Sequence, residues 1–256
     1  MCNVERYGAI MFVSFSVGNT GPFKEITGIT TLAESLKKEL LKENTFEISG
    51  QNYNKISYIY GANGSGKTNY LAALTKMQKM IIMSTVLGAN NNKLLEVPAI
   101  KKELSSPIET FKFDIDCKNK ETEFEIQVVL EGILYTYSFA VQEGKIQREL
   151  LTKKNKRTEI LIKRTSPRYD DITLRSGLAA FKNMVSVVRD DALCLAMAAM
   201  LNNPLAQMIL NEIMNYRIIN MASVGNAPDF DEDNTNAEAI ERYLKYLKIA
   251  DPTLTN

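Results

Sequence analysis

Residues 61–68 constrain this chain more than any other part of its sequence. They read GANGSGKT and match the pattern G-x-x-x-x-G-K-[ST]. Glycines in such a loop let successive backbone N–H groups point toward one centre, where they form a concave anion site that a side chain would block. Lys67 adds a compact positive charge, and Thr68 adds a hydroxyl oxygen of the kind that Mg²⁺ binds as a ligand. The motif therefore predicts a phosphate-binding loop.

The residues on both sides of the loop support this interpretation. Residues 53–60 contain KISYIY, an aromatic and β-branched run that is typical of a buried strand. Residues 69–83 carry apolar side chains at helical spacing, namely Leu71, Leu74, Met77 or Gln78, and Ile81. A helix that starts after Gly66 would direct the positive end of its dipole at a bound phosphate. The expected order is therefore strand, loop and helix.

Nine consecutive residues are the candidate nucleotide contacts: Gly61, Ala62, Asn63, Gly64, Ser65, Gly66, Lys67, Thr68 and Asn69. Lys67 is also the candidate catalytic residue, because its ammonium group would reach the β- and γ-phosphates. Thr68 is the candidate Mg²⁺ ligand. Binding of phosphate is all that such a loop provides, because hydrolysis also needs an acidic residue for Mg²⁺ and a group that positions water.

Three segments are candidates for that acidic residue. Residues 128–131, VVLE, have the required apolar run, but the glycine that follows favours a hairpin turn. Asp114 and Asp116 fall on one face of the alternating run at 111–116, which favours the solvent face of a strand. The acidic run at 229–233 lacks EF-hand spacing and a preceding strand, which favours a solvated loop.

The rest of the chain predicts an antiparallel sheet followed by helices. Strands are expected at 11–17, 111–115, 123–130, 133–141, 145–151 and 159–163, with glycine turns at 131–132 and 143–144. Helices are expected at 31–42, at 192–201 with Asp190 or Asp191 as the cap, from Pro204 to about Met221, and at 237–249. Polar or loop segments are expected at 88–92, 166–178 and 223–236.

Composition narrows the chemistry. The 256 residues carry 31 Lys and Arg against 30 Asp and Glu, so the net charge of +1 gives no long-range attraction to nucleic acid or acidic lipid. The sequence has no His, which excludes Ser-His-Asp and Cys-His catalysis and His-ligated zinc. Cys2, Cys117 and Cys194 form no CxxC pair, which argues against a zinc site and favours a reducing compartment. Without a signal peptide or a membrane-spanning apolar run, a cytoplasmic location is expected.

Two further patterns have structural explanations. One is a basic stretch that would be able to contact nucleic acid, although the lack of interleaved aromatic residues favours a solvated hairpin tip and strand end. It comprises Lys153, Lys154, Lys156, Arg157, Lys163, Arg164 and Arg168. The other is a set of methionines for which core filling is favoured over a partner surface. They are Met197, Met200, Met208, Met214 and Met221.

The loop, together with the opening MFVSFSVGNTGPFKE at residues 11–25, resembles the ABC-like ATPases of the bacterial AAA-type core domain group. These are similar to the OLD-type ATPases and to the chromosome-maintenance ATPase heads. Residues 111–116 and 124–151 resemble the antiparallel β-subdomain of that group, and residues 187–202 resemble its helical insertion. Residues 239–252 resemble the helix that precedes the second half of such ATPases.

The resemblance implies an α/β fold, a P-loop NTPase (ABC-like) lobe over residues 11–256 with an antiparallel β-subdomain and a helical insertion. Its parts would be a strand, loop and helix at 53–85, the β-subdomain at 108–165 and the helical part at 178–250. ATP and Mg²⁺ would be the cofactors. Such proteins hydrolyse ATP as head-to-head dimers, so a homodimer or a second ATPase half is the implied partner. An effector protein, in defence against phage or in DNA transactions, is implied as well.

The chain also departs from that group. An Arg-containing turn commonly follows the Asn in the opening of the family, whereas Asn19 is followed here by Thr20, Gly21, Pro22 and Phe23. Nothing after Asp251 supplies a signature motif, a second acidic strand or a switch histidine. Two interpretations therefore stand side by side: the N-terminal lobe of an ATPase, and a truncated or split nucleotide-binding subunit without turnover of its own. A P-loop kinase would need an Arg-rich lid, for which residues 163–168 are a poor candidate.

Overall fold

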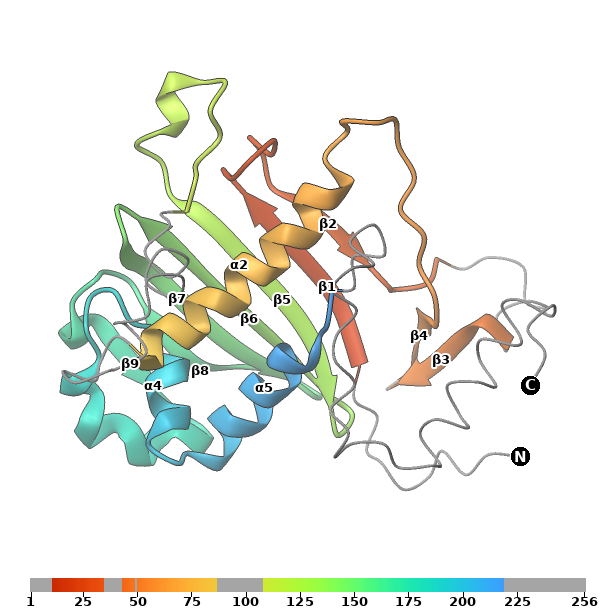
Figure 1. The fold of residues 1–256 in the computed structure, drawn as a ribbon. Coiled ribbons are helices and arrows are strands. Elements are labelled where there is room, and N and C mark those ends of the chain that lie inside the picture. The colour runs from red at the N-terminus through yellow and green to blue at the C-terminus, as the bar shows by residue number, and fades with distance from the viewer. Residues whose placement is uncertain (1–10, 35–42, 49, 87–107, 219–256) are drawn as a thin grey trace, which may run out of the picture. The chain divides into compact units, whose positions relative to one another are not determined.

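The computed structural model of this chain describes residues 11–34, 43–48, 50–86 and 108–218. All of them except Ile218 belong to one compact unit. This unit has a mixed α/β fold whose main element is an antiparallel sheet. The order of the seven strands in this sheet is β2-β1-β5-β6-β7-β8-β9 (Figure 1). They are β1 (Met11–Gly18), β2 (Thr27–Thr30), β5 (Thr122–Leu130), β6 (Ile133–Gln142), β7 (Lys145–Lys154), β8 (Thr158–Arg164) and β9 (Ile172–Leu174).

The four strands β5 to β8 form the meander that the sequence predicts. Two-residue turns join β5 to β6 and β6 to β7, and both turns have positive φ angles, 51° and 75° at Glu131 and Gly132, 51° and 76° at Glu143 and Gly144. Such turns match the right-handed twist of the strands that they connect. The predicted turns are confirmed, and β1 begins where the first strand is predicted. The short β9 lies within the predicted polar break at 166–178.

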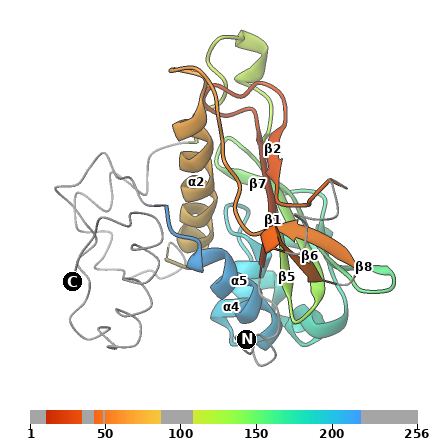
Figure 2. The ribbon, with the colours of Figure 1, turned by 90° about the vertical axis from the view of Figure 1, so that its right-hand side faces the viewer.

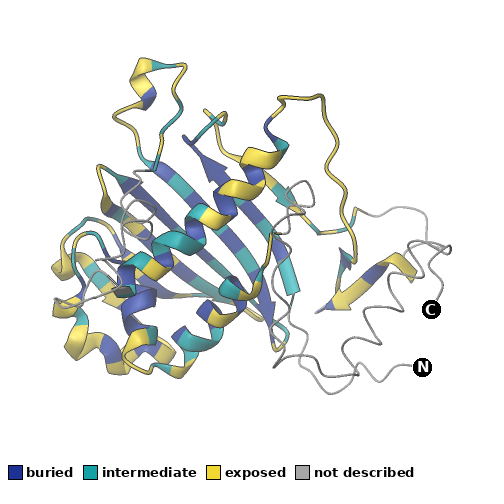
Figure 3. Ribbon diagram, viewed as in Figure 1, coloured by how far each residue is buried: buried dark blue, intermediate teal, exposed yellow. Residues whose placement is uncertain are grey.

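Helix α2 (Lys67–Val86) lies across one face of the sheet, where it packs against β1 and α4 (Figure 1). It buries Tyr70, Ala73, Leu74, Met77 and Ile81 against the inward side chains of the strands. The predicted helix is confirmed, but its buried face differs by one residue from the prediction, because Leu71 is 41% exposed and Tyr70 takes its place. Figure 3 shows the alternation of buried and exposed residues along this helix.

Two shorter helices complete the same layer, α4 (Cys194–Met200) and α5 (Pro204–Asn215). In the view of Figure 2 they lie with α2 on one side of the sheet. A two-stranded hairpin of β3 (Thr45–Ile48) and β4 (Gln51–Asn54) packs against the other face, where Ile48 and Tyr53 meet Val13 and Val129 in a small separate cluster. Val129 follows Val128 in β5 and therefore points to the opposite face.

Four predictions about individual elements are wrong, either in where the element begins or ends or in its type. The strand predicted for residues 53–60 ends at Asn54, and the strand predicted for residues 111–115 is irregular chain that leads into the 3-10 helix η2 (Ile115–Cys117). The predicted caps Asp190 and Asp191 do not cap α4, because the helix begins at Cys194 and its N-cap is Leu193. Their carboxylates pair with Lys145 and Arg189 instead. Helix α5 ends at Asn215, short of Met221, and Asn203 caps its start by accepting a hydrogen bond from the N–H of Ala206 at 3.0 Å.

The remaining expectations concern the linking segments. After the short 3-10 helix η3 (Tyr169–Asp171), residues 176–187 form 3-10 turns, η4 (Ser176–Val187), where helix was expected from Leu178 onward. Residues 31–34 are not helical, and the rest of the predicted helix at 31–42 lies outside the described residues. The segments 88–92, 223–236 and 237–249 lie outside them as well. Within the described part, no helix combines the length and the apolar character that crossing a bilayer takes.

Candidate phosphate-binding site

The glycine-rich loop, residues 61–68, leads into the first turn of α2 and uses two glycines in the left-handed region. Gly64 has a φ angle of 82° and Gly66 one of 95°, conformations that strain any residue with a Cβ atom. At Gly66 the space is also limited, because an added Cβ would lie 3.2 Å from Cγ of Pro22 and 3.4 Å from the ring of Phe23. The loop therefore rests against the turn at residues 19–23, which follows β1.

Lys67 folds its side chain back over this loop. Its Nζ atom donates hydrogen bonds to the carbonyl oxygens of Gly61 and Ala62, at 2.7 Å and 2.8 Å, and lies 3.4 Å from Oγ of Ser65. An ammonium group has three donors, so the loop satisfies all of them. A bound anion would compete with these oxygens for the same charge. The loop is closely wrapped, because a Cβ atom on Gly61 would lie 2.6 Å from Oγ of Ser65.

The N-terminus of α2 presents the positive end of the helix dipole, and no acidic side chain in the first turn neutralises it. The carbonyl of Gly66 accepts the hydrogen bond of the Tyr70 N–H at 2.9 Å, so the helical ladder begins at this glycine. The first turn carries no acidic side chain, and Thr68 and Asn69 are exposed. The first N–H groups of a helix have no partner within the helix, and an anion at that end is stabilised by the dipole.

Tyr70 fixes this helix start to the sheet. Its buried hydroxyl donates to the carbonyl oxygen of Phe15 in β1 and accepts from the N–H of Ile29 in β2 at 3.0 Å. Burial raises the pKa of Tyr70 to about 12. Two strands are thus tied to the residue three positions after Lys67, so the sheet determines where the loop lies.

The segment that enters the loop is not held in this way. Residues 55–60 form no strand, and Ile56, Tyr58 and Tyr60 are 68%, 73% and 86% exposed. The opposite side chains of the segment, Ser57 and Ile59, help to line an apolar cavity of about 200 Å³ beside Tyr70. The sequence prediction of a buried strand is therefore wrong here, because the described chain provides no neighbouring strand with which residues 56–60 could pair.

The described structure gives the predicted acidic candidates structural roles. Glu131 lies in the hairpin turn between β5 and β6. Asp114 accepts from the N–H of Asp116 at 2.9 Å and pairs with Nζ of Lys24 at 2.8 Å, which holds the pKa of the Asp114 carboxyl below its usual value. The run at 229–233 lies outside the described residues. Among the residues that are described, no group of three or more Cys, Asp or Glu side chains is arranged to hold a metal ion.

The predicted basic stretch divides into two kinds of residue. Lys153 pairs with Glu159 at 2.9 Å and Arg168 with Asp170 at 2.9 Å on the surface. Arg164, in contrast, is buried and donates to backbone carbonyls, including that of Ala192 at 2.7 Å. The stretch is therefore not one continuous cationic surface. Of the methionines, Met197 is buried, Met208 and Met214 pack against the core, Met200 is exposed and Met221 lies outside the described residues.

Sequence reasoning did not find the buried carboxylate of Glu149. This group accepts hydrogen bonds from the hydroxyl of Tyr137 at 2.9 Å and from the N–H groups of Cys194 and Leu195 at 2.7 Å and 2.9 Å. Burial raises the pKa of Glu149 and lowers that of Arg164, its cross-strand neighbour in β8. The available signal was a charged residue at an inward position of a strand, two residues before the buried Leu151.

The turn at residues 19–23 holds its own unusual residue. Asn19 has a φ angle of 49°, and its side-chain amide donates to the carbonyls of Cys117 and Lys120 at 2.9 Å and 3.0 Å. Its side-chain oxygen accepts from the N–H of Phe111 at 3.2 Å. Asn19 thus anchors the loop at 111–120 to the end of β1, next to the turn on which Gly66 rests.

Comparison of the chain with protein-family models, with curated proteins and with solved structures gives no match.

Proposed function

We propose that this protein binds a nucleoside triphosphate through residues 61–69, with the phosphates on the loop and the start of α2. The observation that carries the proposal is the loop itself: positive φ angles at Gly64 and Gly66 directly before a helix whose first turn has no acidic residue. Such a loop exposes backbone N–H groups to an anion. Lys67 would move from the loop carbonyls to the β- and γ-phosphates.

The nucleotide is ATP with Mg²⁺ by the resemblance to ABC-like ATPases described above. Thr68 fits the role of Mg²⁺ ligand because its hydroxyl is exposed beside Lys67, at the helix end where the phosphates would lie. The ion would neutralise phosphate charge and orient the phosphate oxygens. By the same resemblance, the protein is a cytoplasmic P-loop NTPase lobe that couples nucleotide binding to dimerisation, with an effector in defence against phage.

Binding is better supported than turnover. Hydrolysis takes a carboxylate for Mg²⁺ and a group that orients water. Within the described residues, Asp114 is engaged by Lys24, and Glu131 is in a hairpin turn. We therefore propose a nucleotide-binding subunit whose hydrolysis, where it occurs, depends on residues beyond those that the structure describes or on a second polypeptide.

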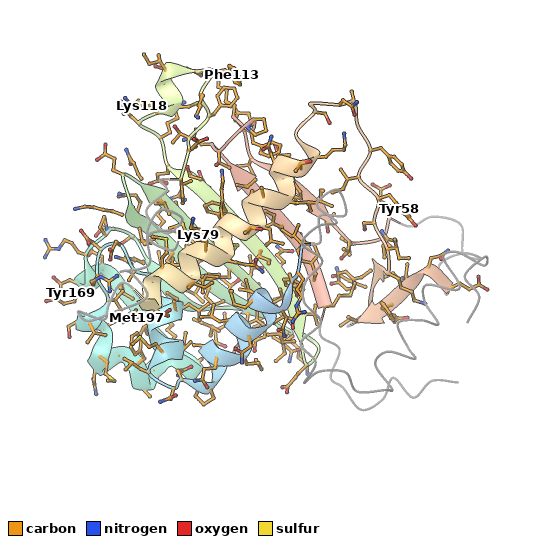
Figure 4. All side chains as sticks on the ribbon, viewed as in Figure 1. Tyr58, Lys79, Phe113, Lys118, Tyr169 and Met197 are labelled. Carbon is orange, nitrogen blue, oxygen red and sulfur yellow. The ribbon has the colours of Figure 1, made fainter. Side chains whose placement is uncertain are left out.

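Titration of the full chain with ATP and Mg²⁺ by calorimetry tests the proposal. We expect binding by the wild type and at least a tenfold weaker affinity for Lys67→Ala, because a charge-assisted contact to phosphate contributes about 1.5 to 3 kcal/mol. Gly66→Val should abolish binding by closing the loop against Pro22 and Phe23. The matched control is Lys79→Ala, which removes a lysine of the same helix at a distance from the loop (Figure 4).

Equal affinity of the wild type and Lys67→Ala would overturn the assignment of the loop. Release of phosphate by the wild type alone would show turnover, and transfer of phosphate to an added acceptor would identify a kinase instead. Binding without release is the result that the described residues favour.

A further inference from the structure

An open cavity of about 420 Å³ lies over strands β1, β5, β6, β7 and β8. The helices α2, α4 and α5 are on one side of the sheet, as Figure 2 shows. The side chains of Phe15, Phe124 and Ile126 are buried in the core on the helix side. Ser16 and Glu125 alternate with them along β1 and β5, so they point into the cavity on the opposite face. A volume of this size is typical of small-molecule sites, which measure roughly 300 to 1,000 Å³.

Three polar side chains form one row across the floor of this cavity. Glu125 on β5 lies directly opposite Ser16 on β1 and, on its other side, directly opposite Ser138 on β6. The Cβ atoms of such cross-strand neighbours are about 4.5 to 5.5 Å apart. All three side chains are partly buried, and none has a hydrogen bond or an ion pair with another residue in the described part of the chain. One carboxylate and two hydroxyls are therefore available to a ligand in the cavity.

The carboxylate in this row has no cation beside it. Burial raises the pKa of Glu125, and no positive group among the described residues offsets this rise. Arg148 also lines the cavity, but the carboxylates of Glu121 and Glu123 bind its guanidinium group at 2.8 Å and 3.3 Å. Lys163 lies in the same row three strands from Glu125. At about 4.8 Å per strand it is roughly 14 Å away, where salt screens the interaction. A ligand that brings a positive charge to Glu125 therefore offsets the cost of its burial.

We propose that this cavity binds a small primary amine, whose ammonium group donates hydrogen bonds to the carboxylate of Glu125 and to the hydroxyls of Ser16 and Ser138. A primary ammonium group has three donors, which matches one acceptor from each of the three side chains. The apolar side chains of Ile26 and Leu150 also line the cavity, where they contact the alkyl part of the ligand. The site is separate from the glycine-rich loop, because none of its residues lines the cavity.

Titration of the ¹⁵N-labelled full chain with n-pentylamine, followed by NMR, tests the proposal. The amide signals of Ser16, Glu125 and Ser138 should shift and saturate, with a dissociation constant on the order of 1 mM, which suits a ligand this small. Glu125→Gln keeps the shape of the side chain and removes its charge, so it should weaken binding at least tenfold. Ser138→Ala should weaken binding about threefold, because it removes one neutral acceptor. The same spectra report whether each variant is folded.

Three related probes separate the ammonium contacts from other effects. 1-Pentanol has the same alkyl chain without the charge and should give no saturable shifts. N,N,N-Trimethylpentylammonium keeps the charge but has no N–H donor, so it should bind at least tenfold more weakly than n-pentylamine. Equal binding of this probe would overturn the hydrogen-bonded arrangement. Nα-Acetyl-lysine methylamide presents the same amine on a peptide, and its binding in the absence of n-pentylamine binding would overturn a small-molecule site.

Two variants serve as matched controls. Glu47→Gln makes the same change at an exposed glutamate of β3 that does not line the cavity, and it should bind n-pentylamine as the wild type does. Lys67→Ala should do the same, because the inference does not depend on nucleotide binding. The absence of saturable shifts at about 20 mM n-pentylamine overturns the proposal, as does equal affinity of the wild type and Glu125→Gln.

Discussion

The meander of β5 to β8 and the segment that enters the glycine-rich loop have similar sequences but adopt different structures. Both have alternating β-branched and aromatic residues. The meander strands are joined by turns of two or three residues, so each strand pairs with a neighbour close to it in the sequence, and its inward side chains are buried. Residues 56–60 have no such neighbour among the described residues and remain exposed. Strand propensity therefore produces a ladder only where the topology supplies a partner.

The loop itself lies between these two regions. On its C-terminal side, Tyr70 and the buried face of α2 are fixed to the sheet. On its N-terminal side, the chain is held by the pairing of β4 with β3, and residues 56–60 then form no backbone hydrogen bond with any other described residue. A change on the sheet side should thus lower the stability of the fold, whereas a change on the segment side should leave it nearly unchanged. Four predictions test that division.

The largest effect is expected at Glu149. Glu149→Ala should lower the free energy of unfolding by about 3 to 5 kcal/mol, because it leaves Arg164 buried without its negative neighbour and leaves the hydroxyl of Tyr137 and two N–H groups without their acceptor. Urea denaturation measures the loss. Glu123→Ala is the control, since Glu123 pairs with Arg148 on the surface and should cost less than about 1 kcal/mol. Similar losses for both variants would contradict the role of Glu149.

Truncation of the α2 face comes next. Met77 is fully buried between α2 and the sheet, so Met77→Ala should cost about 2 to 4 kcal/mol through lost contacts and the cavity that remains. Leu71→Ala changes the same helix at a position that is 41% exposed and should cost less than about 1 kcal/mol. Thermal unfolding of the two variants compares them directly. A larger loss at Leu71 would mean that another element covers the outer face of the helix.

Tyr70→Phe should have a smaller effect at neutral pH and a distinctive one at high pH. Removal of the hydroxyl leaves the N–H of Ile29 without its acceptor, at a cost of about 1 to 2 kcal/mol. The folded pKa of Tyr70, about 12, exceeds its unfolded value of 10. Its contribution is therefore complete below pH 10 and is lost as the pH rises toward 12, by about 2 to 3 kcal/mol.

Urea denaturation of the wild type and Tyr70→Phe at pH 8 and at pH 11.5 measures this difference. The two proteins should become more alike in stability at the higher pH, because only the wild type has the hydroxyl to lose. Curves that keep a constant separation would contradict the burial of Tyr70. Other buried tyrosines titrate equally in both proteins and cancel in the comparison.

The smallest effect is expected on the segment side. Tyr58→Ala should change the free energy of unfolding by no more than about 0.5 kcal/mol, since Tyr58 is 73% exposed. Urea denaturation of the wild type and Tyr58→Ala measures this difference. A loss above about 1.5 kcal/mol would show that residues 56–60 pack within their own chain, as the meander strands do.

The sequence predicted what depends on neighbours along the chain. The glycine turns, the meander strands and the helix that begins at Lys67 follow from local patterns, and the structure has them. Residues 111–115 show why alternation alone is insufficient. Phe113 and Ile115 are 88% and 85% exposed, because Asn19 holds this segment as a loop and no strand among the described residues pairs with it.

The sequence could not predict contacts between distant residues. Asn19 bonds to residues about a hundred positions away, and Glu149 reaches Cys194 and Leu195 across 45 and 46 positions. Neither pairing leaves a periodic pattern. The phosphate-binding role of residues 61–69 stays a prediction, because it depends on a ligand and not on the fold.

Glu149 also has a consequence for the order of folding. A helix of seven residues such as α4 is too short to be stable by itself, and its N-cap Leu193 has no side chain that could bond its first amides. The carboxylate on β7 does this instead, so α4 can form only after β7 has taken its place between β6 and β8. The hairpins of the meander close over short loops and should form first. The helical layer around α4 should therefore be the last part of this unit to fold and the first to be lost.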